Sequence, residues 1–306
     1  MINIWKNKKG STQLLTLGLM LFTLLSFSEI IAREKITNAE KLGYPKGKKI
    51  LLLHCDDAGM CEEANIAVQS YILKGDVLSA AVMMPCPNAE EMVEWAKKHP
   101  TSDIGVHLTL TSEWKKYRWT TLTDPKKVPG LIDPEGKMWP EVMDVVPHAT
   151  PKEVETEIRT QIDKMIKMGL KPSHIDTHMG TLYGSAEYAK VFFKTAVEDN
   201  IPANAIDLSN KEVADYYRAA GYPINDEMIK YLESYPLPKL DNFTSAPEGK
   251  TYQEKRENFM KLDKVKYDNK GIKIEESSYK SDGKVIKKAL YKFDDNGKEI
   301  EAIFYE

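Results

Sequence analysis

Short apolar runs separated by longer amphipathic segments mark the region between Lys48 and about Ile206. A short continuous apolar run is typical of a strand that is buried on both faces. The first run continues into His54, Cys55 and two aspartates, so the strand that it predicts ends in polar residues. The runs that predict strands cover residues 51–53, 77–84, 104–110, 172–178 and 203–208.

Helical periodicity fills the intervals between these runs, where apolar residues recur three and four positions apart. Thr150, Pro151 and Glu153 give the clearest start signal, a capping box with proline at the first helical position. Gly75 and Gly169 follow two of the segments and are expected to end their helices. The predicted helices cover residues 62–74, 89–98, 151–168 and 185–200. The alternation of strand and helix predicts an α/β fold with a parallel sheet or barrel.

Residues 111–149 break this alternation and are rich in proline, glycine and tryptophan. A long excursion from the end of a sheet strand often covers an active site. Trp114, Trp119 and Trp139 either stack on sugar rings or pack the excursion against the rest of the domain. The sequence leaves both interpretations open.

The C-terminal segment, residues 263–306, has a different character. Gly271, Gly283 and Gly297 each close a turn-like motif, and short strand-like segments lie between them. This degenerate repeat predicts a small β-meander. We therefore expect the main domain over residues 33–262 and the meander over residues 263–306.

The first residues resemble an export signal rather than part of the fold. Lys6, Lys8 and Lys9 precede an apolar stretch at residues 14–27 that is too short for a comfortable membrane span. Ala32 is the expected cleavage point, so residues 1–32 are predicted to be a signal peptide. An uncleaved N-terminal anchor is the alternative. Either way we expect a periplasmic or secreted domain, with no stable membrane span once the signal is removed.

Composition limits the classes of partner. The chain has 306 residues, 42% of them hydrophobic, and a formal net charge of −3, which allows one sizeable domain and a small appendage. No basic excess is present, so a nucleic-acid partner is not expected. Cys55, Cys61 and Cys86 either include one disulfide or are small buried hydrophobic residues.

Polar side chains gather where three of the predicted strands end. Asp56 and Asp57 follow the first run, His107 lies in the third, and His178 ends the fourth. The carboxyl ends of parallel strands meet at one edge of the sheet, where α/β folds bind ligands. One carboxylate and two imidazoles can hold a divalent metal and leave room for water. We predict Asp57, His107 and His178 as ligands and Asp56 as the base that takes the proton from the water.

Each of these residues also has a structural interpretation. An isolated Asp-Asp pair more often caps a helix, and a lone histidine such as His107 is more often part of the core. Only the conjunction of three polar strand ends favours a metal site. His174 and Asp176 share a strand face with His178. The choice between His174 and His178 as third ligand stays open, with His178 preferred because it is nearer the strand end.

Four ordered motifs carry a family resemblance: residues 50–60 (ILLLHCDDAGM), 75–80 (GDVLSA), 104–110 (IGVHLTL) and 172–178 (PSHIDTH). They resemble the YdjC-type carbohydrate deacetylases, a branch of the polysaccharide deacetylase superfamily, over roughly residues 48–260. The resemblance implies a distorted (β/α) barrel and the metal-dependent removal of N-acetyl groups from amino sugars or short chito-oligosaccharides.

The resemblance also implies roles for individual residues. Asp56 would be the base, while Asp57, His107 and His178 would bind the metal, with zinc or magnesium as the expected ion. His174 or Asp176 would orient a ligand imidazole. An N-acetylated amino sugar or oligosaccharide is the expected substrate.

The chain departs from the family pattern at three points. Met179, Gly180 and Thr181 stand where relatives carry further histidines. No histidine follows His178, although the family uses a late histidine as general acid, and His148 is a speculative substitute. The β-repeat tail begins where the last barrel strands are expected, which leaves open whether the barrel is complete. A catalytically weakened carbohydrate-binding protein and a metal-dependent hydrolase of another ester or amide are therefore kept as alternatives.

Overall fold

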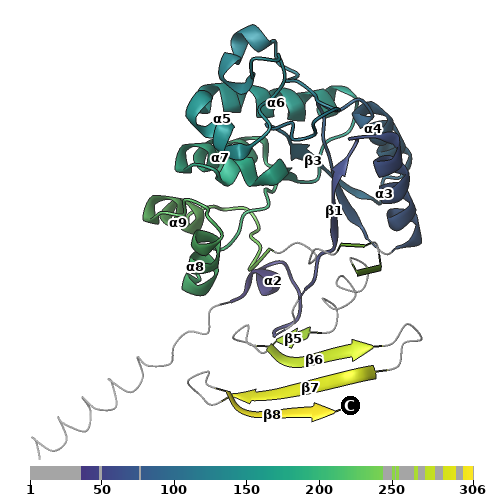
Figure 1. Cartoon of the computed structure of the whole chain (residues 1–306), viewed down its shortest axis with the longest axis vertical. Coiled ribbons are helices and arrows are strands. Elements are labelled where there is room, and N and C mark those ends of the chain that lie inside the picture. The colour runs from purple at the N-terminus through teal and green to yellow at the C-terminus, as the bar shows by residue number, and fades with distance from the viewer. Residues whose placement is uncertain are drawn as a thin grey trace, which may run out of the picture. The chain divides into compact units, whose positions relative to one another are not determined.

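The structure is a computed structural model of the chain (Figure 1). It describes residues 36–47, 50–75, 77–243, 250–251 and 253–254, and the backbone of the strands at 265–267, 273–279, 285–293 and 299–305. The chain divides into two compact units, Met1–Lys46 and Gly47–Glu306. The described part of the first unit holds a one-turn helix, α2 (Asn38–Lys41), which begins with a capping box between Thr37 and Glu40.

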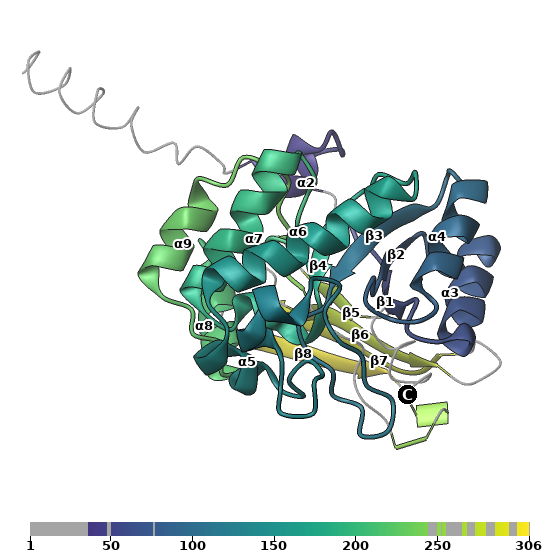
Figure 2. The same cartoon turned by 90° about the horizontal axis from the view of Figure 1, so that it is seen from above.

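A parallel sheet of four strands forms the centre of the second unit. The strands pair in sequence order. They are β1 (His54–Ala58), β2 (Ser79–Val82), β3 (Asp103–Leu108) and β4 (Ile175–Thr177). The connecting helices are α3 (Glu62–Lys74), α4 (Ala89–Lys98), α6 (Pro151–Lys167) and α7 (Ala186–Asp199). Figure 2 shows α3 and α4 on one flank of the sheet and α6 and α7 on the other. The α/β prediction is confirmed, and among the described residues the sheet does not close into a barrel.

The local signals for helices correspond closely to the observed ends. Thr150 and Glu153 form the predicted capping box, with Pro151 as the first helical residue. Gly75 follows α3 in the left-handed conformation, with φ of 74°. The apolar faces of these helices pack against the sheet and contribute Val68, Met92, Ile158 and Phe192 to the core.

The first strand differs from its prediction. The leucines at 51–53 lie outside the sheet, and Leu51 and Leu52 are exposed. The strand begins at His54, which pairs with Ser79, the first residue of β2. Because a strand needs a paired neighbour, β1 cannot start earlier than β2 allows. The polar residues after the apolar run therefore form the strand itself.

The second and third strands are also shorter than predicted, and the last two predicted strands differ most from the structure. β4 contains only Ile175–Thr177. Residues 203–208 make single parallel bridges, one from Ala203 to Ile175 and one from Ile206 to Leu240. In this segment the amides of Ala205 and Leu208 donate to carbonyls two residues earlier. Such tight turns interrupt the extended backbone that a continuous ladder requires.

The excursion after β3 contains two short 3-10 turns, η1 (Pro125–Lys127) and η2 (Pro129–Leu131), and the helix α5 (Val142–His148). Its tryptophans differ in environment. Trp119 is buried, and the ring of Trp139 packs on the main core. Trp114 is half exposed. Packing therefore accounts for two of the three rings.

The helices α8 (Lys211–Ala219) and α9 (Asp226–Glu233) follow α7. The strands β5 (Val265–Tyr267), β6 (Lys273–Tyr279), β7 (Val285–Phe293) and β8 (Glu299–Tyr305) form an antiparallel sheet in sequence order, which is a meander. The cysteines are free thiols: Cys86 is buried, and Cys55 and Cys61 are partly buried.

None of the helices in the described part of the chain is both long and apolar enough to cross a lipid bilayer. The predicted signal peptide at residues 1–32 lies outside the described residues.

Glu157 of α6 anchors the excursion to the main domain. Its buried carboxylate accepts hydrogen bonds from the amides of Leu122 and Thr123, at 3.0 and 2.9 Å. We expect Glu157→Ala to lower the free energy of unfolding by about 2–6 kcal/mol, because it leaves two amides without partners at about 1–3 kcal/mol each. Urea denaturation measures this change. Asp163→Ala, at an exposed position of the same helix, should stay within about 0.5 kcal/mol of the parent. Equal effects of both substitutions would contradict the anchoring role.

Candidate metal centre

A distortion in β1 sets the position of the two aspartates. The register between β1 and β2 shifts between Cys55 and Ala58, as in a β-bulge. Asp57 lies inside this irregularity with φ of 60°, in the left-handed region that non-glycine residues rarely adopt. Such strain persists only where surrounding contacts hold it, and it is frequent at functional sites.

His107 lies on β3 opposite Asp176 of β4 and is 3% exposed. Its Nδ1 donates a hydrogen bond of 2.7 Å to Asp176 Oδ1. Since one nitrogen of a neutral imidazole carries the proton, this bond leaves the Nε2 lone pair of His107 free. His107 Nε2 lies 3.3 Å from Asp57 Oδ1.

His178 follows β4 directly and begins the 3-10 segment η3 (His178–Tyr183). Met179 and Gly180 turn the chain sharply behind it, with φ of 52° and 68°. The Nε2 of His178 donates to Glu113 Oε2 at 3.0 Å, which leaves the Nδ1 lone pair free. His178 Nδ1 lies 3.2 Å from Asp57 Oδ1.

Three electron-pair donors therefore converge at one point. Asp57 Oδ1 is 3.2–3.3 Å from the two imidazole nitrogens, and these nitrogens are 3.3 Å from each other. The Asp57 oxygen is buried and has no hydrogen-bond partner. Lone pairs facing one another repel unless a cation or a proton lies between them.

The chemistry of these donors fits a metal ion. A tetrahedral ion with bonds of about 2.0–2.1 Å keeps its ligand atoms roughly 3.3–3.4 Å apart, close to the observed triangle. The outer nitrogen of each imidazole is held by a carboxylate, Asp176 for His107 and Glu113 for His178. Protein metal sites use this arrangement to fix the tautomer and orientation of a ligand histidine.

The charges of neighbouring side chains shift the pKa values of all three triad residues. Burial opposes ionisation of Asp57, but the imidazoles of His107 and His178 outweigh it and lower the pKa of this carboxyl. Burial also favours neutral His107, yet Asp176, Asp57 and Asp56 raise its pKa well above the ordinary value. The pKa of His178 is raised in the same way by Asp57 and Glu113. A metal must displace these protons, so metal affinity should fall as the pH falls.

Asp56 lies beside the triad. Its Oδ1 is 3.3 Å from His54 Nε2, and one of its oxygens lies within 4.8 Å of ligand atoms of His107 and Asp176. Half of its side chain is exposed to solvent. Lost hydration raises the pKa of Asp56 above its ordinary value, in part against the opposing influence of His107. A carboxyl with a raised pKa and access to solvent is suited to accept a proton.

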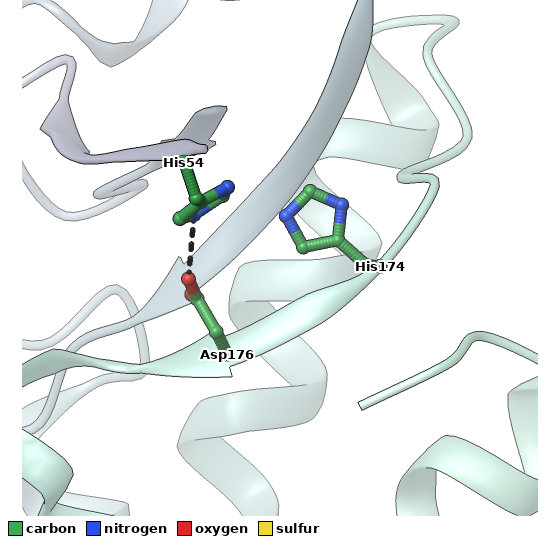
Figure 3. Close-up of side chains that lie close together, drawn as sticks. All are labelled: His54, His174 and Asp176. Carbon is green, nitrogen blue, oxygen red and sulfur yellow. Dashed lines mark hydrogen bonds and ion pairs between the residues drawn. The ribbon is translucent and has the colours of Figure 1, made fainter. Parts of the chain in front are cut away.

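The remaining candidates form a second group, drawn in Figure 3. His54 Nε2 bonds to Asp176 Oδ2 at 3.0 Å, and His174 lies with its ring next to that of His54. The sequence left the third ligand open between His174 and His178. The structure brings His178, and not His174, to Asp57 and His107.

Some residues of the site were not predicted. Glu113 holds His178, Asp103 lies 3.3 Å from His174 Nδ1, and His54 bonds to Asp176. His54 precedes the Asp-Asp pair and could have been included from that position. Glu113 lies in the irregular excursion, where no periodicity indicates the direction of a side chain.

Residues of the excursion pack against the site. The ring of Trp119 lies edge-on to that of His178, with centroids 6.3 Å apart. Tyr117 donates a hydrogen bond to the carbonyl of Met60, just after β1. His148 stacks on Trp139 and bonds to the carbonyl of Asp144, so this speculative acid serves the packing of the excursion.

The family model described as "YdjC-like protein" matches residues 50–304, so the chain belongs to the YdjC-like family.

Individual relatives carry more specific names. The chain is 31% identical over 152 residues to a "Carbohydrate deacetylase" of Brevibacillus brevis, covering 50% of this chain and 57% of the relative. It is 32% identical over 158 residues to a protein of the same name from Thermus thermophilus, covering 51% and 53%. The chain therefore spans little more than half the length of these curated relatives.

A solved structure shares the fold. The chain resembles a protein of Enterococcus faecalis V583 named for cellobiose-phosphate cleavage. The TM-score is 0.51 at 25% identity, covering 62% of this chain and 66% of that one.

The carboxylate behind His178 offers a test of the triad. We expect Glu113→Gln to weaken Co²⁺ binding at the triad by about 10–100-fold, because the neutral amide oxygen is a weaker acceptor for the Nε2–H of His178 than the carboxylate and makes the imidazole a poorer ligand. Titration followed by visible absorption measures the affinity. Glu135→Gln, at an exposed position of the same excursion, should bind Co²⁺ like the parent. Unchanged affinity in Glu113→Gln would show that Glu113 does not support a ligand.

Proposed function

We propose that the protein is a metal-dependent carbohydrate deacetylase that removes N-acetyl groups from amino sugars or short chito-oligosaccharides. The observation that carries the proposal is the convergence of Asp57, His107 and His178 on one point, with Asp56 beside them. The names of the family's curated members support the reaction and the carbohydrate substrate.

A divalent ion, zinc or magnesium, bound by Asp57, His107 and His178 would acidify water and polarise the acetamide carbonyl. Asp56 takes the proton of the attacking water, and its raised pKa suits that role. Asp176 and Glu113 keep the two imidazoles oriented through their outer nitrogens. Trp119 of the excursion packs edge-on against His178 on one side of the triad.

The leaving amine also needs a proton. No histidine follows His178, and His148 is engaged in packing. Asp56 is the half-exposed acid beside the triad, so it is placed to return to the nitrogen the proton that it took from water. One carboxyl would then act first as base and then as acid.

Removal of the Asp56 carboxylate tests this role. We expect Asp56→Asn to lower kcat for acetate release from N-acetylglucosamine oligomers by about 10²–10⁴-fold, because the amide cannot accept the proton. Zinc binding should remain, since Asp56 is not one of the three proposed ligands. His99→Gln, which changes an imidazole bound to the carbonyl of Trp95, should leave kcat unchanged. No acetate release by folded parent protein with any divalent metal would refute the deacetylase.

A second candidate is a carbohydrate-binding protein of the same fold that has lost catalysis. The chain's lack of a late histidine favours it. Oligosaccharide binding without turnover, unaffected by Asp56→Asn, would establish this alternative. Turnover of another acetyl ester or amide in a substrate panel would distinguish a hydrolase of a different substrate from the deacetylase and from the carbohydrate-binding protein.

We also propose that the domain is exported, because Lys6, Lys8 and Lys9 precede the apolar stretch at residues 14–27. Expression in a Gram-negative host should yield a mature protein that begins at Arg33 and is released with the periplasmic fraction. N-terminal sequencing identifies the first residue. An intact N-terminus in the membrane fraction would indicate an uncleaved anchor, and one in the cytosol would contradict export.

A further inference from the structure

A second group of potential ligands lies behind His107. One ligand atom from each of His54, His174 and Asp176 lies within 4.8 Å of the other two. Figure 3 shows the His54 and His174 rings above the Asp176 carboxylate, with a nitrogen of His174 facing His54. The ring centroids are 5.0 Å apart and the planes are inclined by 75°, so the two rings do not stack.

The outer nitrogen of each imidazole has an oxygen partner. His54 Nδ1 lies 2.8 Å from Ser79 Oγ. His174 Nδ1 lies 2.9 Å from Ser173 Oγ and 3.3 Å from Asp103 Oδ1. Because a carboxylate only accepts hydrogen bonds, His174 carries its proton on Nδ1 and its lone pair on Nε2.

That lone pair has no partner. His174 Nε2 is buried and makes no hydrogen bond. Gly105 on β3 leaves the space for it, since a Cβ at this position would lie 2.5 Å from His174 Nε2. A buried imidazole nitrogen without a partner is unfavourable and is expected where a further ligand binds.

We propose that His54, His174 and Asp176 form a second divalent-cation site, next to the triad of Asp57, His107 and His178. Asp176 is common to both: its Oδ1 accepts from the outer nitrogen of His107, and its Oδ2 is 3.0 Å from His54 Nε2, so a metal would displace the proton between these two atoms. Two imidazoles and one carboxylate favour a first-row transition ion such as Zn²⁺ or Co²⁺ over Mg²⁺.

The charges around the two groups favour a second cation. The imidazoles are neutral when they bind metal, whereas the carboxylates stay ionised. Two divalent ions supply four positive charges, which nearly balance the acids of both groups. These acids are Asp56, Asp57, Asp103, Glu113 and Asp176.

The site also has a structural consequence. His54 lies on β1, whereas Asp176 lies on β4, and these are the outermost strands of the four-stranded order. The side chains of His54 and Asp176 already connect these two strands at 3.0 Å, and an ion bound to both would strengthen that link.

Metal stoichiometry of the metal-free full chain tests the proposal without any assay of turnover. Calorimetric titration with Zn²⁺ should give two equivalents for the parent protein and for His99→Gln. His174→Gln should bind one equivalent of Zn²⁺. It should retain the binding step of the triad, which His178→Gln should lose. Failure of the deacetylase proposal would not alter these counts.

One equivalent in the parent protein, or two in folded His174→Gln, would overturn the second site. The parent protein decides the case if the variant does not fold. Crystals loaded with Zn²⁺ should show an anomalous peak between His54, His174 and Asp176, in addition to one at the triad. A peak at the triad alone, at saturating Zn²⁺, would equally refute the site.

Discussion

The rest of the site depends on the hydrogen bonds of one buried carboxylate, that of Asp176. One oxygen accepts from His107 on the neighbouring strand, and the other bonds to His54 on β1. Burial opposes its charge, but these imidazoles lower the pKa of Asp176 and keep it ionised. A buried charge without partners is costly, so the carboxylate and its imidazoles hold one another in place. The hydrogen bond from His107 Nδ1 to Asp176 fixes the tautomer of His107 and directs the lone pair of its Nε2 toward Asp57.

Two backbone irregularities complete the geometry. Asp57 adopts a left-handed conformation within a bulge of β1, and Met179 and Gly180 do so after β4. Regular strands would place neighbouring side chains on opposite faces and would not bring Asp57 and His178 to one point. The excursion adds Glu113 behind His178, and the buried Glu157 anchors the excursion to α6. Packing far from the triad therefore helps to position His178.

Two independent findings support the proposed metal-dependent deacetylation. They are the membership of the YdjC-like family and the arrangement of the acids and imidazoles. The family match extends from residue 50 to residue 304, whereas the curated relatives are matched over little more than half their length. In the sequence, no histidine follows His178. In the proposed deacetylase, proton delivery would therefore fall to carboxyl groups, of which Asp56 is the half-exposed one beside the triad.

Local signals in the sequence determined the helices and the parallel order of the sheet. The capping box at Thr150 and the glycine at 75 act over a few residues, so both could be read directly. The polar strand ends also indicated Asp57, His107 and His178, since parallel strands end at a common edge. Tertiary structure alone decided that β1 begins at His54, because pairing with β2 sets that limit. It alone separated His174 from His178 and brought Glu113 to the site. Each of these depends on contacts between residues far apart in the chain, which local pattern does not encode.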